Sequence, residues 1–219
     1  MNKPKPINIR PNKTINDLII FFEKVVITFT GSSSYKKQYH EDSDEDHLTE
    51  ILVWHYQEIN RNNNENYIIM PQPRQENRRK VDIGIGLHGG QGNYIFCIEA
   101  KILPTNEYIT GNTGAIKRFK KCEHGLSGSN PKNRKPLSYS GIVAYVKSGT
   151  FNEHLMKINK KIQEIASKHS EKPDEFGLTW YNSEQLEKIY FSSIARLISK
   201  HPRENTCHIN LNHFWISVH

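Results

Sequence analysis

The sequence predicts a single α/β domain in which helices flank a mixed central β-sheet. Three observations favour this fold class: strand-like and helix-like segments alternate, neither an internal repeat nor a convincing linker interrupts them, and 219 residues suffice for one domain with a substantial core. A segment order of this kind is typical of a sheet covered by helices, because an apolar sheet face needs a second layer.

The start of the chain is polar and rich in proline and lysine. We expect residues 1–13 to form a flexible arm and residues 14–219 to form the domain. The apolar stretch TINDLIIFFEKVVITF (14–29) fits a helix passing into a strand, and its periodicity does not settle which of the two it is. A loop over 31–46 should follow, and its acidic end suits the N-terminus of a helix that runs from about Asp44 to Asn60.

The remaining elements follow from apolar patterns and turn residues. Strand-like segments cover 66–72, 80–87, 93–103, 139–149, 187–198 and 207–218, and HGGQG is a good hairpin loop between the second and third. A basic helix over 113–125 should end at Gly125, and a basic loop follows it. Apolar residues at helical spacing predict an amphipathic helix from Phe151 to beyond Ile165.

The charge balance favours a polyanionic partner. The chain has 30 Lys and Arg against 23 Asp and Glu, a formal charge of +7, so nucleic acid is the first candidate and an anionic membrane surface the second. Simple solubility explains the same balance. Cys97, Cys122 and Cys207 suggest neither a disulfide framework nor a zinc site, and no signal peptide or long apolar run is present, so we expect a soluble, cytoplasmic protein.

The segment YIFCIEAKIL (94–103) places two charges in an otherwise apolar strand. Alternation puts Tyr94, Phe96, Ile98, Ala100 and Ile102 on one face, the core face, and Cys97, Glu99 and Lys101 on the other. A buried carboxylate is costly unless it is paired. The two charges therefore lie side by side on one surface, where a site can form.

The preceding strand adds a second carboxylate to this surface. Its apolar face holds Val81, Ile83, Ile85 and Leu87, whereas Asp82 lies opposite with Gly84 and Gly86, which should leave open space beside the acid. Ordinary hairpin register brings Asp82 near Glu99. Two carboxylates suit Mg²⁺, which prefers oxygen ligands, and a neighbouring lysine can orient or deprotonate an attacking water and stabilise developing charge.

These two strands, VDIGIGL and YIFCIEAKIL, resemble the active-site signature of the PD-(D/E)XK nuclease superfamily, whose fold is called restriction endonuclease-like. The resemblance implies that Asp82 and Glu99 bind metal and that Lys101 is the catalytic lysine. Val81 stands where the family often has proline, although that proline is frequently missing. The spacing of seventeen residues between Asp82 and Glu99 fits a hairpin.

Many members of the fold also use a glutamate from a helix before the sheet. At about 100° per residue, Glu45 shares a stripe with the apolar residues Leu48, Leu52 and Tyr56, whereas Glu50 points away. We therefore prefer Glu45 over Glu50 as the third metal-site carboxylate. An acidic residue favoured by the helix dipole in the first turn is an equally good interpretation of Glu45.

Positive charge surrounds these acids in the sequence. The basic helix carries Lys117, Arg118, Lys120 and Lys121, and RRK (78–80) and KNRK (132–135) add more. Such side chains hold phosphates, although each run alone is as well explained by a solvated face. The predicted nucleic-acid contacts are Arg118, Lys117, Lys121, Arg79 and Lys80.

The sequence thus predicts a nuclease that uses Mg²⁺, or Mn²⁺ in its place, on nucleic acid, with DNA the first candidate. A wider pattern over 45–216 resembles uncharacterised restriction-like proteins, some encoded near bacterial antiviral genes, which implies an effector or accessory subunit. A partner encoded nearby or a homodimer would supply specificity. The rival is a non-catalytic nucleic-acid-binding or assembly subunit that keeps the fold. His213, before an aromatic pair, is interpreted as structural.

Overall fold

A mixed β-sheet organises the residues that the structure, a computed structural model, describes: 11–63, 65–73, 80–89, 93–128, 134–203 and 207–218, with side chains from residue 14 onward. These residues form seven strands in the order β1-β2-β3-β4-β7-β6-β5. The strands are β1 (Tyr67–Pro71), β2 (Ile83–Leu87), β3 (Tyr94–Leu103), β4 (Tyr139–Val146), β5 (Glu187–Phe191), β6 (Ile194–His201) and β7 (Ile209–Ser217).

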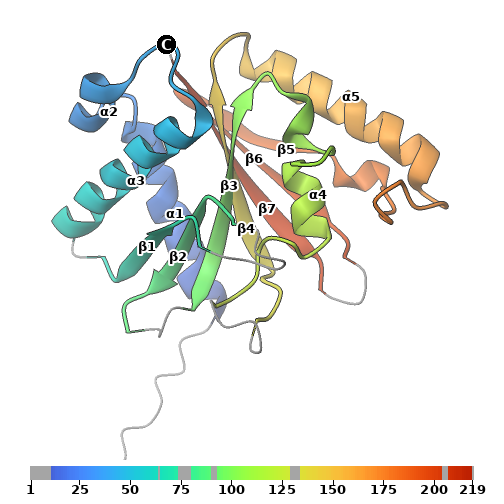
Figure 1. Ribbon diagram of the computed structural model, residues 1–219, viewed down its shortest axis with the longest axis horizontal. Coiled ribbons are helices and arrows are strands. Elements are labelled where there is room, and N and C mark those ends of the chain that lie inside the picture. Colours follow the sequence, from blue (N-terminus) through green and yellow to red (C-terminus); the bar gives the residue numbers. More distant parts are fainter. Residues whose placement is uncertain are drawn as a thin grey trace, which may run out of the picture.

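Helices cover both faces of the sheet (Figure 1). The first face carries α1 (Pro11–Thr28) and α3 (Glu45–Asn62), with the short α2 (Ser33–Gln38) between them in sequence. The second face carries α4 (Ala115–Lys120) and α5 (Phe151–His169). Two 3₁₀ turns, η2 (Asn106–Tyr108) and η4 (Asn182–Glu184), complete the described elements. The predicted α/β fold class, one mixed sheet flanked by helices, is confirmed.

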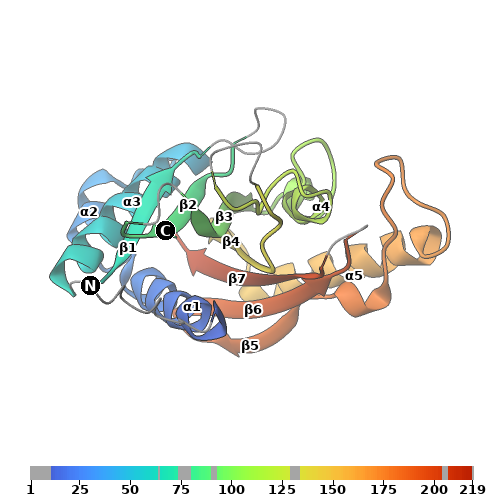
Figure 2. The ribbon, with the colours of Figure 1, turned by 90° about the horizontal axis from the view of Figure 1, so that it is seen from below.

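Strand directions follow from the connections. The strands β1, β2 and β3 form an antiparallel meander, whereas β3, β4 and β7 run parallel to one another in the centre. Parallel neighbours need a crossover, which α4 supplies between β3 and β4. The antiparallel pairs β7–β6 and β6–β5 complete the other side of the sheet, with α1 lying against it (Figure 2). Because helices cover both faces, β4 is buried along almost its whole length.

Four predicted elements differ from the structure. The arm predicted over 1–13 lies mostly outside the described residues, but α1 already begins at Pro11 and continues as one helix to Thr28. The expected loop over 31–46 contains α2, which Ser32 caps by accepting a hydrogen bond from the Tyr35 amide. The single strand expected over 187–198 is the hairpin β5–β6, turned at two serines rather than at glycine or asparagine.

The fourth difference is the length of the basic helix, which ends at Lys120 rather than at Gly125. Cys122 has a φ of 54°, in the left-handed region that terminates helices. The chain then folds back, and the amides of Glu123 and His124 both donate to the carbonyl of Arg118. This tight turn directs His124 into the interior instead of continuing the helical face.

The assignment of faces was wrong for Val81 and Tyr94. Val81 lies in the core of the second face, whereas Ile83 and Ile85, predicted to share its face, lie in the core of the first. An irregularity between β2 and β3 pairs Gly86 with Tyr94 rather than with Ile95, so Tyr94 lies with Cys97 in the core of the second face. The glycine surface is also closed rather than open. A Cβ on Gly84 would lie 2.7 Å from Pro73 Cγ, and a Cβ on Gly86 would lie 2.6 Å from the Asn93 carbonyl oxygen. These glycines allow close packing and do not create space beside Asp82.

A buried polar network crosses the core of the second face. Burial of these groups is tolerated because each is hydrogen-bonded to the next. His213 Nδ1 lies 2.7 Å from Tyr108 Oη, and His213 Nε2 lies 2.8 Å from Ser199 Oγ. The network runs in order through Trp215, Tyr108, His213, Ser199, His201, Glu184 and Lys120. His213 is therefore a structural residue, as the sequence predicted.

No helix in the described ranges combines the length and apolar character needed to cross a membrane.

The network predicts that acid destabilises the fold. Burial lowers the pKa of His213 well below its ordinary value, helped by His201 and Arg196. Burial also lowers the pKa of His201, against the opposing effect of Glu184 and with help from Lys120 and Arg203. The unfolded chain therefore binds more protons, and stability falls as pH drops below about 6.5, by up to about 1.4 kcal/mol per pH unit for each histidine.

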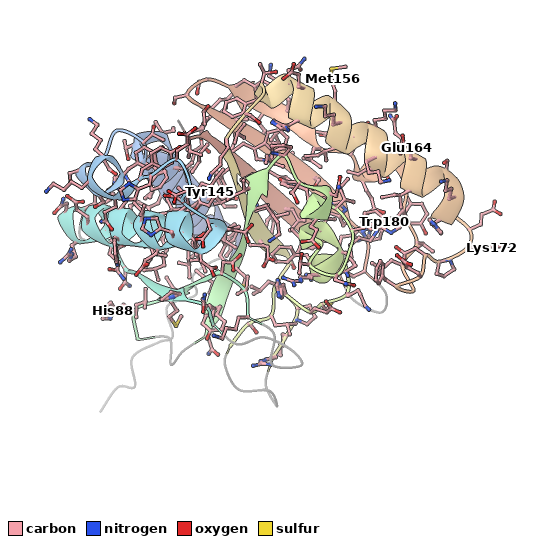
Figure 3. All side chains as sticks on the ribbon, turned by 45° about the horizontal axis from the view of Figure 1, so that its top comes forward. His88, Tyr145, Met156, Glu164, Lys172 and Trp180 are labelled. Atoms are coloured by element: carbon pink, nitrogen blue, oxygen red, sulfur yellow. The ribbon has the colours of Figure 1, made fainter. Side chains whose placement is uncertain are left out.

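Urea unfolding between pH 7.5 and 5 measures this slope. We expect His213→Gln to lower it by roughly a third, because one of the three described histidines whose pKa is lowered by burial, His55, His201 and His213, no longer contributes. His88→Gln is the matched control, since His88 is exposed at the periphery (Figure 3), and it should leave the slope unchanged. An unchanged slope in the His213 variant would contradict the assignment.

Candidate active site

The candidate site lies where β2 stops and β3 continues. Pairing of the two strands extends only to Ile83 opposite Ile98, so the later residues of β3 pair with β4 alone. Asp82, directly before β2, accepts a hydrogen bond from the Ala100 amide at 2.6 Å through Oδ2. A side-chain carboxylate thus replaces the missing backbone partner at an otherwise open strand edge.

Glu99 is the most buried acid of the site, with a side-chain exposure of 1 %. Arg118 Nη1 lies 2.8 Å from its Oε1, and Lys101 Nζ lies 3.3 Å from the same atom. His124 Nδ1 lies 2.8 Å from its Oε2. Burial alone would raise the pKa of Glu99, but contact with His124 and the charges of Lys101 and Arg118 outweigh it and lower the pKa. Glu99 is therefore a stable anion.

Lys101 lies between two carboxylates. Its Nζ is 3.0 Å from Glu45 Oε1 and 3.3 Å from Glu99 Oε1, and its side chain is almost completely buried. Burial would lower the pKa of this lysine, but Glu99, Glu45 and Asp82 together raise it above its ordinary value. Lys101 is thus held as an ammonium ion, which favours donation and charge stabilisation over proton abstraction.

Glu45 reaches the site because several contacts fix the start of α3. Lys147 Nζ donates to the carbonyls of Ser43 and Glu41, at 2.6 and 2.8 Å, and so ties the preceding loop to the end of β4. The Asp44 side chain caps the helix by accepting from the His47 amide. Glu45 therefore lies against Lys101.

Two further hydrogen bonds connect Glu45 to β4 through Thr49. The Tyr145 hydroxyl, in the interior (Figure 3), donates to Thr49 Oγ1 at 3.3 Å, and Thr49 Oγ1 donates to the Glu45 carbonyl at 2.7 Å. Glu50 is exposed on the outer side of the same helix. The sequence offered Glu45 and Glu50 as the third carboxylate, and the structure brings Glu45 to Lys101. Burial raises the pKa of Glu45 against the opposing effect of Lys101.

Asp82 differs from Glu99 in its electrostatic environment. Burial and the negative charge of Glu99 raise the pKa of Asp82 well above its ordinary value. The Ala100 amide and Lys101 act in the opposite direction without overcoming these effects. Glu99 thus has strong cationic partners, whereas Asp82 is an acid that a further positive charge would stabilise.

The predicted basic contacts separate into three groups. Arg118 lies in the site, and its Nε has no hydrogen-bond partner among the described residues. Lys121 and Lys80 are exposed, near Glu123 and Gln72 respectively. Arg79, with the neighbouring Arg78 and residues 132–133, lies outside the described residues.

The burial of Lys117 contradicts its prediction as a nucleic-acid contact, and Lys120 of the same basic helix is buried as well. Lys117 has an exposed fraction of 3 %, donates to the carbonyl of Gly111 and lies over the ring of Phe176. Lys120 is bound to both carboxylate oxygens of Glu184 in the interior. A count of basic residues along the segment does not reveal that both lysines are buried.

The donor chemistry of the site suits a hard divalent cation, although no three His, Cys, Asp or Glu side chains of the described ranges form a preformed metal group. Asp82, Glu99 and Glu45 offer carboxylate oxygens, the ligands that Mg²⁺ prefers. Glu99 Oε2 is buried without a well-formed hydrogen bond, because the close contact with His124 is poorly oriented. In this arrangement the Lys101 ammonium neutralises Glu45 and Glu99.

Four residues of this site escaped the sequence analysis: His124, Thr49, Tyr145 and Lys147. His124 precedes Gly125 in a segment that looks like an ordinary helix end, and only the tight turn after α4 directs it to Glu99. Tyr145 and Lys147 lie at the end of a strand whose apolar pattern says nothing about α3. Tyr145 and Lys147 act through contacts with residues that lie about a hundred positions earlier in the chain.

No protein-family model matches the chain, and neither a curated protein nor a solved structure matches it.

The unequal environments of the two acids predict opposite effects on stability. Glu99→Gln should destabilise the fold by about 3 to 5 kcal/mol, because Lys101 and Arg118 lose the buried anion between them. Asp82→Asn should stabilise it by about 1 kcal/mol, because the amide still accepts from Ala100 while the repulsion from Glu99 disappears.

Urea unfolding at pH 7 provides the measurement, and Glu50→Gln on the exposed side of α3 is the control, expected to change stability by less than about 0.5 kcal/mol. Equal destabilisation by the Glu99 and Asp82 variants would contradict the described charge distribution.

Proposed function

We propose that the protein is a metal-dependent nuclease with a restriction endonuclease-like fold, which hydrolyses phosphodiester bonds in nucleic acid. The observation that carries the proposal is the convergence of Glu45, Asp82, Glu99 and Lys101 at one open strand edge. These residues come from three separate segments of the chain. Stability alone does not account for all of these carboxylates, since Asp82 and Glu45 are disfavoured as anions there.

Mg²⁺, or Mn²⁺ in its place, would be held by Asp82 and Glu99, with Glu45 completing the site. When bound, the cation supplies Lewis acidity, which neutralises charge on the scissile phosphate and favours loss of a proton from the attacking water. The carboxylate chemistry of the site supports this cofactor, and the raised pKa of Asp82 marks where an added cation is most favourable.

The chain's own cations act on the substrate. Lys101, held as an ammonium ion, would orient the attacking water and donate to the developing negative charge. Arg118, whose side chain is partly exposed, would hold a phosphate oxygen. Water attacks phosphorus in line, the phosphorus–oxygen ester bond breaks, and the products are a phosphate monoester and a hydroxyl group.

The overall charge supports a polyanionic substrate. With a formal charge of +7, the chain attracts nucleic acid in general, and the exposed Lys121 and Lys80 add to this attraction. The resemblance noted in the sequence extends the proposal to an effector or accessory nuclease of an antiviral defence system, in which a protein partner or a second copy confers specificity.

Cleavage of plasmid DNA and of a labelled RNA tests the function. We expect cutting in Mg²⁺ or Mn²⁺, none in EDTA, and a loss of about 100-fold or more in Lys101→Ala, because the lysine acts on charge that develops in the transition state. Lys172→Ala, an exposed lysine beyond α5 (Figure 3), is the matched control and should retain full activity.

A purified chain that binds nucleic acid but never cuts it, alone or with its genomic neighbours, would establish the non-catalytic alternative. Such a binder would show salt-sensitive affinity that is unchanged by EDTA. Thermal unfolding of the Lys101 variant distinguishes a loss of chemistry from a loss of structure, because Lys101 also contacts Glu45 and Glu99.

A further inference from the structure

A groove leads away from the candidate site along the outer side of α3. It has a volume of about 420 Å³ and lies between this helix and the adjoining ends of β1 and β2. Asp82 lines one end, together with Asp46 and His47 from the first turn of α3, next to Glu45. Gln57 lies further along the helix, and eleven residues of helix span about 16 Å. The groove is therefore continuous with the candidate site.

Trp54 lines this groove and is unusually exposed for its type. Its exposed fraction is 40 %, whereas Trp180 and Trp215 are completely buried. Val53 and Pro71 add apolar surface beside it, and Gln57 and Gln72 add amides that can donate and accept hydrogen bonds. A flat aromatic surface with polar groups around it suits a planar heteroaromatic ring.

The charges of the groove determine which part of a nucleic acid fits. Asp46 and Glu50 line it, His47 is the one basic residue among its described lining residues, and Lys80 lies at its rim, where its Nζ donates to Gln72 Oε1. The carboxylates of Asp46 and Glu50 disfavour a phosphate beside them, whereas the exocyclic amino groups of a base would find acceptors. The cations that suit phosphate, Lys101 and Arg118, lie instead at the candidate site. The base and the phosphate of one nucleotide thus have complementary surfaces next to each other.

We infer that this groove binds an unpaired nucleobase, stacked on Trp54, from the nucleotide next to the scissile phosphate. A base in a duplex is stacked between its neighbours and cannot enter, so the substrate is single-stranded or has a base turned out of the helix. This inference rests on the proposed function and specifies its substrate class.

Tryptophan fluorescence tests the groove without any cleavage. A single-stranded DNA octamer is titrated in EDTA into the full chain, and the same sequence is titrated as a blunt duplex. Because Trp180 and Trp215 are buried, quenching reports Trp54. We expect quenching by the single strand and much weaker quenching by the duplex. Trp54→Leu should weaken single-strand binding, measured by anisotropy of a labelled octamer, by about 5-fold to 100-fold.

Matched variants separate stacking from general effects. Trp54→Phe keeps an aromatic ring and should restore most of the affinity. Tyr181→Leu removes an aromatic residue that is equally exposed, at 41 %, but lies after α5 and not in the groove, so it should leave binding unchanged. Circular dichroism of each variant checks folding.

Abasic substitutions identify which base of the octamer stacks on Trp54. Each position of the octamer is replaced in turn by an abasic residue, and one or two positions should lose as much affinity as Trp54→Leu. In the Trp54→Leu protein, abasic substitution at the same positions should reduce the affinity little further, because both changes remove the same stacking contact. A single-strand affinity that is unchanged in Trp54→Leu, or equal affinities for duplex and single strand, overturns this inference alone. Absence of any nucleic-acid binding overturns the proposed function with it.

Discussion

The buried carboxylate of Glu99 is the interaction on which the candidate site depends. Arg118 of α4, His124 of the turn after α4 and Lys101 of the same strand all contact it. An unpaired carboxylate at this depth would be too costly to keep ionised, so these groups must surround it for the strand to fold as it does. The turn after α4, with Cys122 in the left-handed region, brings His124 to this anion.

The difference in length between β2 and β3 adds the second requirement. Because β2 begins only at Ile83, the end of β3 has a free edge, and Asp82 and Glu45 approach it as side chains rather than as strand backbone. A longer β2 would satisfy the same amides with carbonyl groups and leave no carboxylates there. The two acids are thus a consequence of where one strand ends. The contacts of Lys147 with the loop before α3 and of Tyr145 with Thr49 in α3 hold Glu45 at that position.

The sequence predicted the parts of this arrangement that follow local periodicity. Alternation along β3 placed Glu99 and Lys101 together, the hairpin placed Asp82 beside them, and the helical stripe favoured Glu45 over Glu50. It did not predict the irregularity that moves Tyr94 to the other face, the closed surface over Gly84, or the burial of Lys117. Each of these depends on packing between segments far apart in the chain, and a pattern of residue types along one segment carries no information about such contacts.

The buried network and the candidate site use polar groups in different ways. In the second-face network from Trp215 to Lys120, every member bonds to its neighbour, and the groups are neutral or paired, which suits a permanent part of the core. Ser199, His201 and Glu184 are hydrogen-bonded one to the next in this network, and these are residue types that some hydrolases use together. All three are buried, so the arrangement serves stability rather than hydrolysis. At the edge of β3 the opposite holds: Asp82 and Glu45 lie where their charge is disfavoured and where a groove opens beside them. The proposed divalent cation would supply the positive charge that this cluster lacks, and for this reason we place the proposed chemistry at the edge of β3 and not in the buried network.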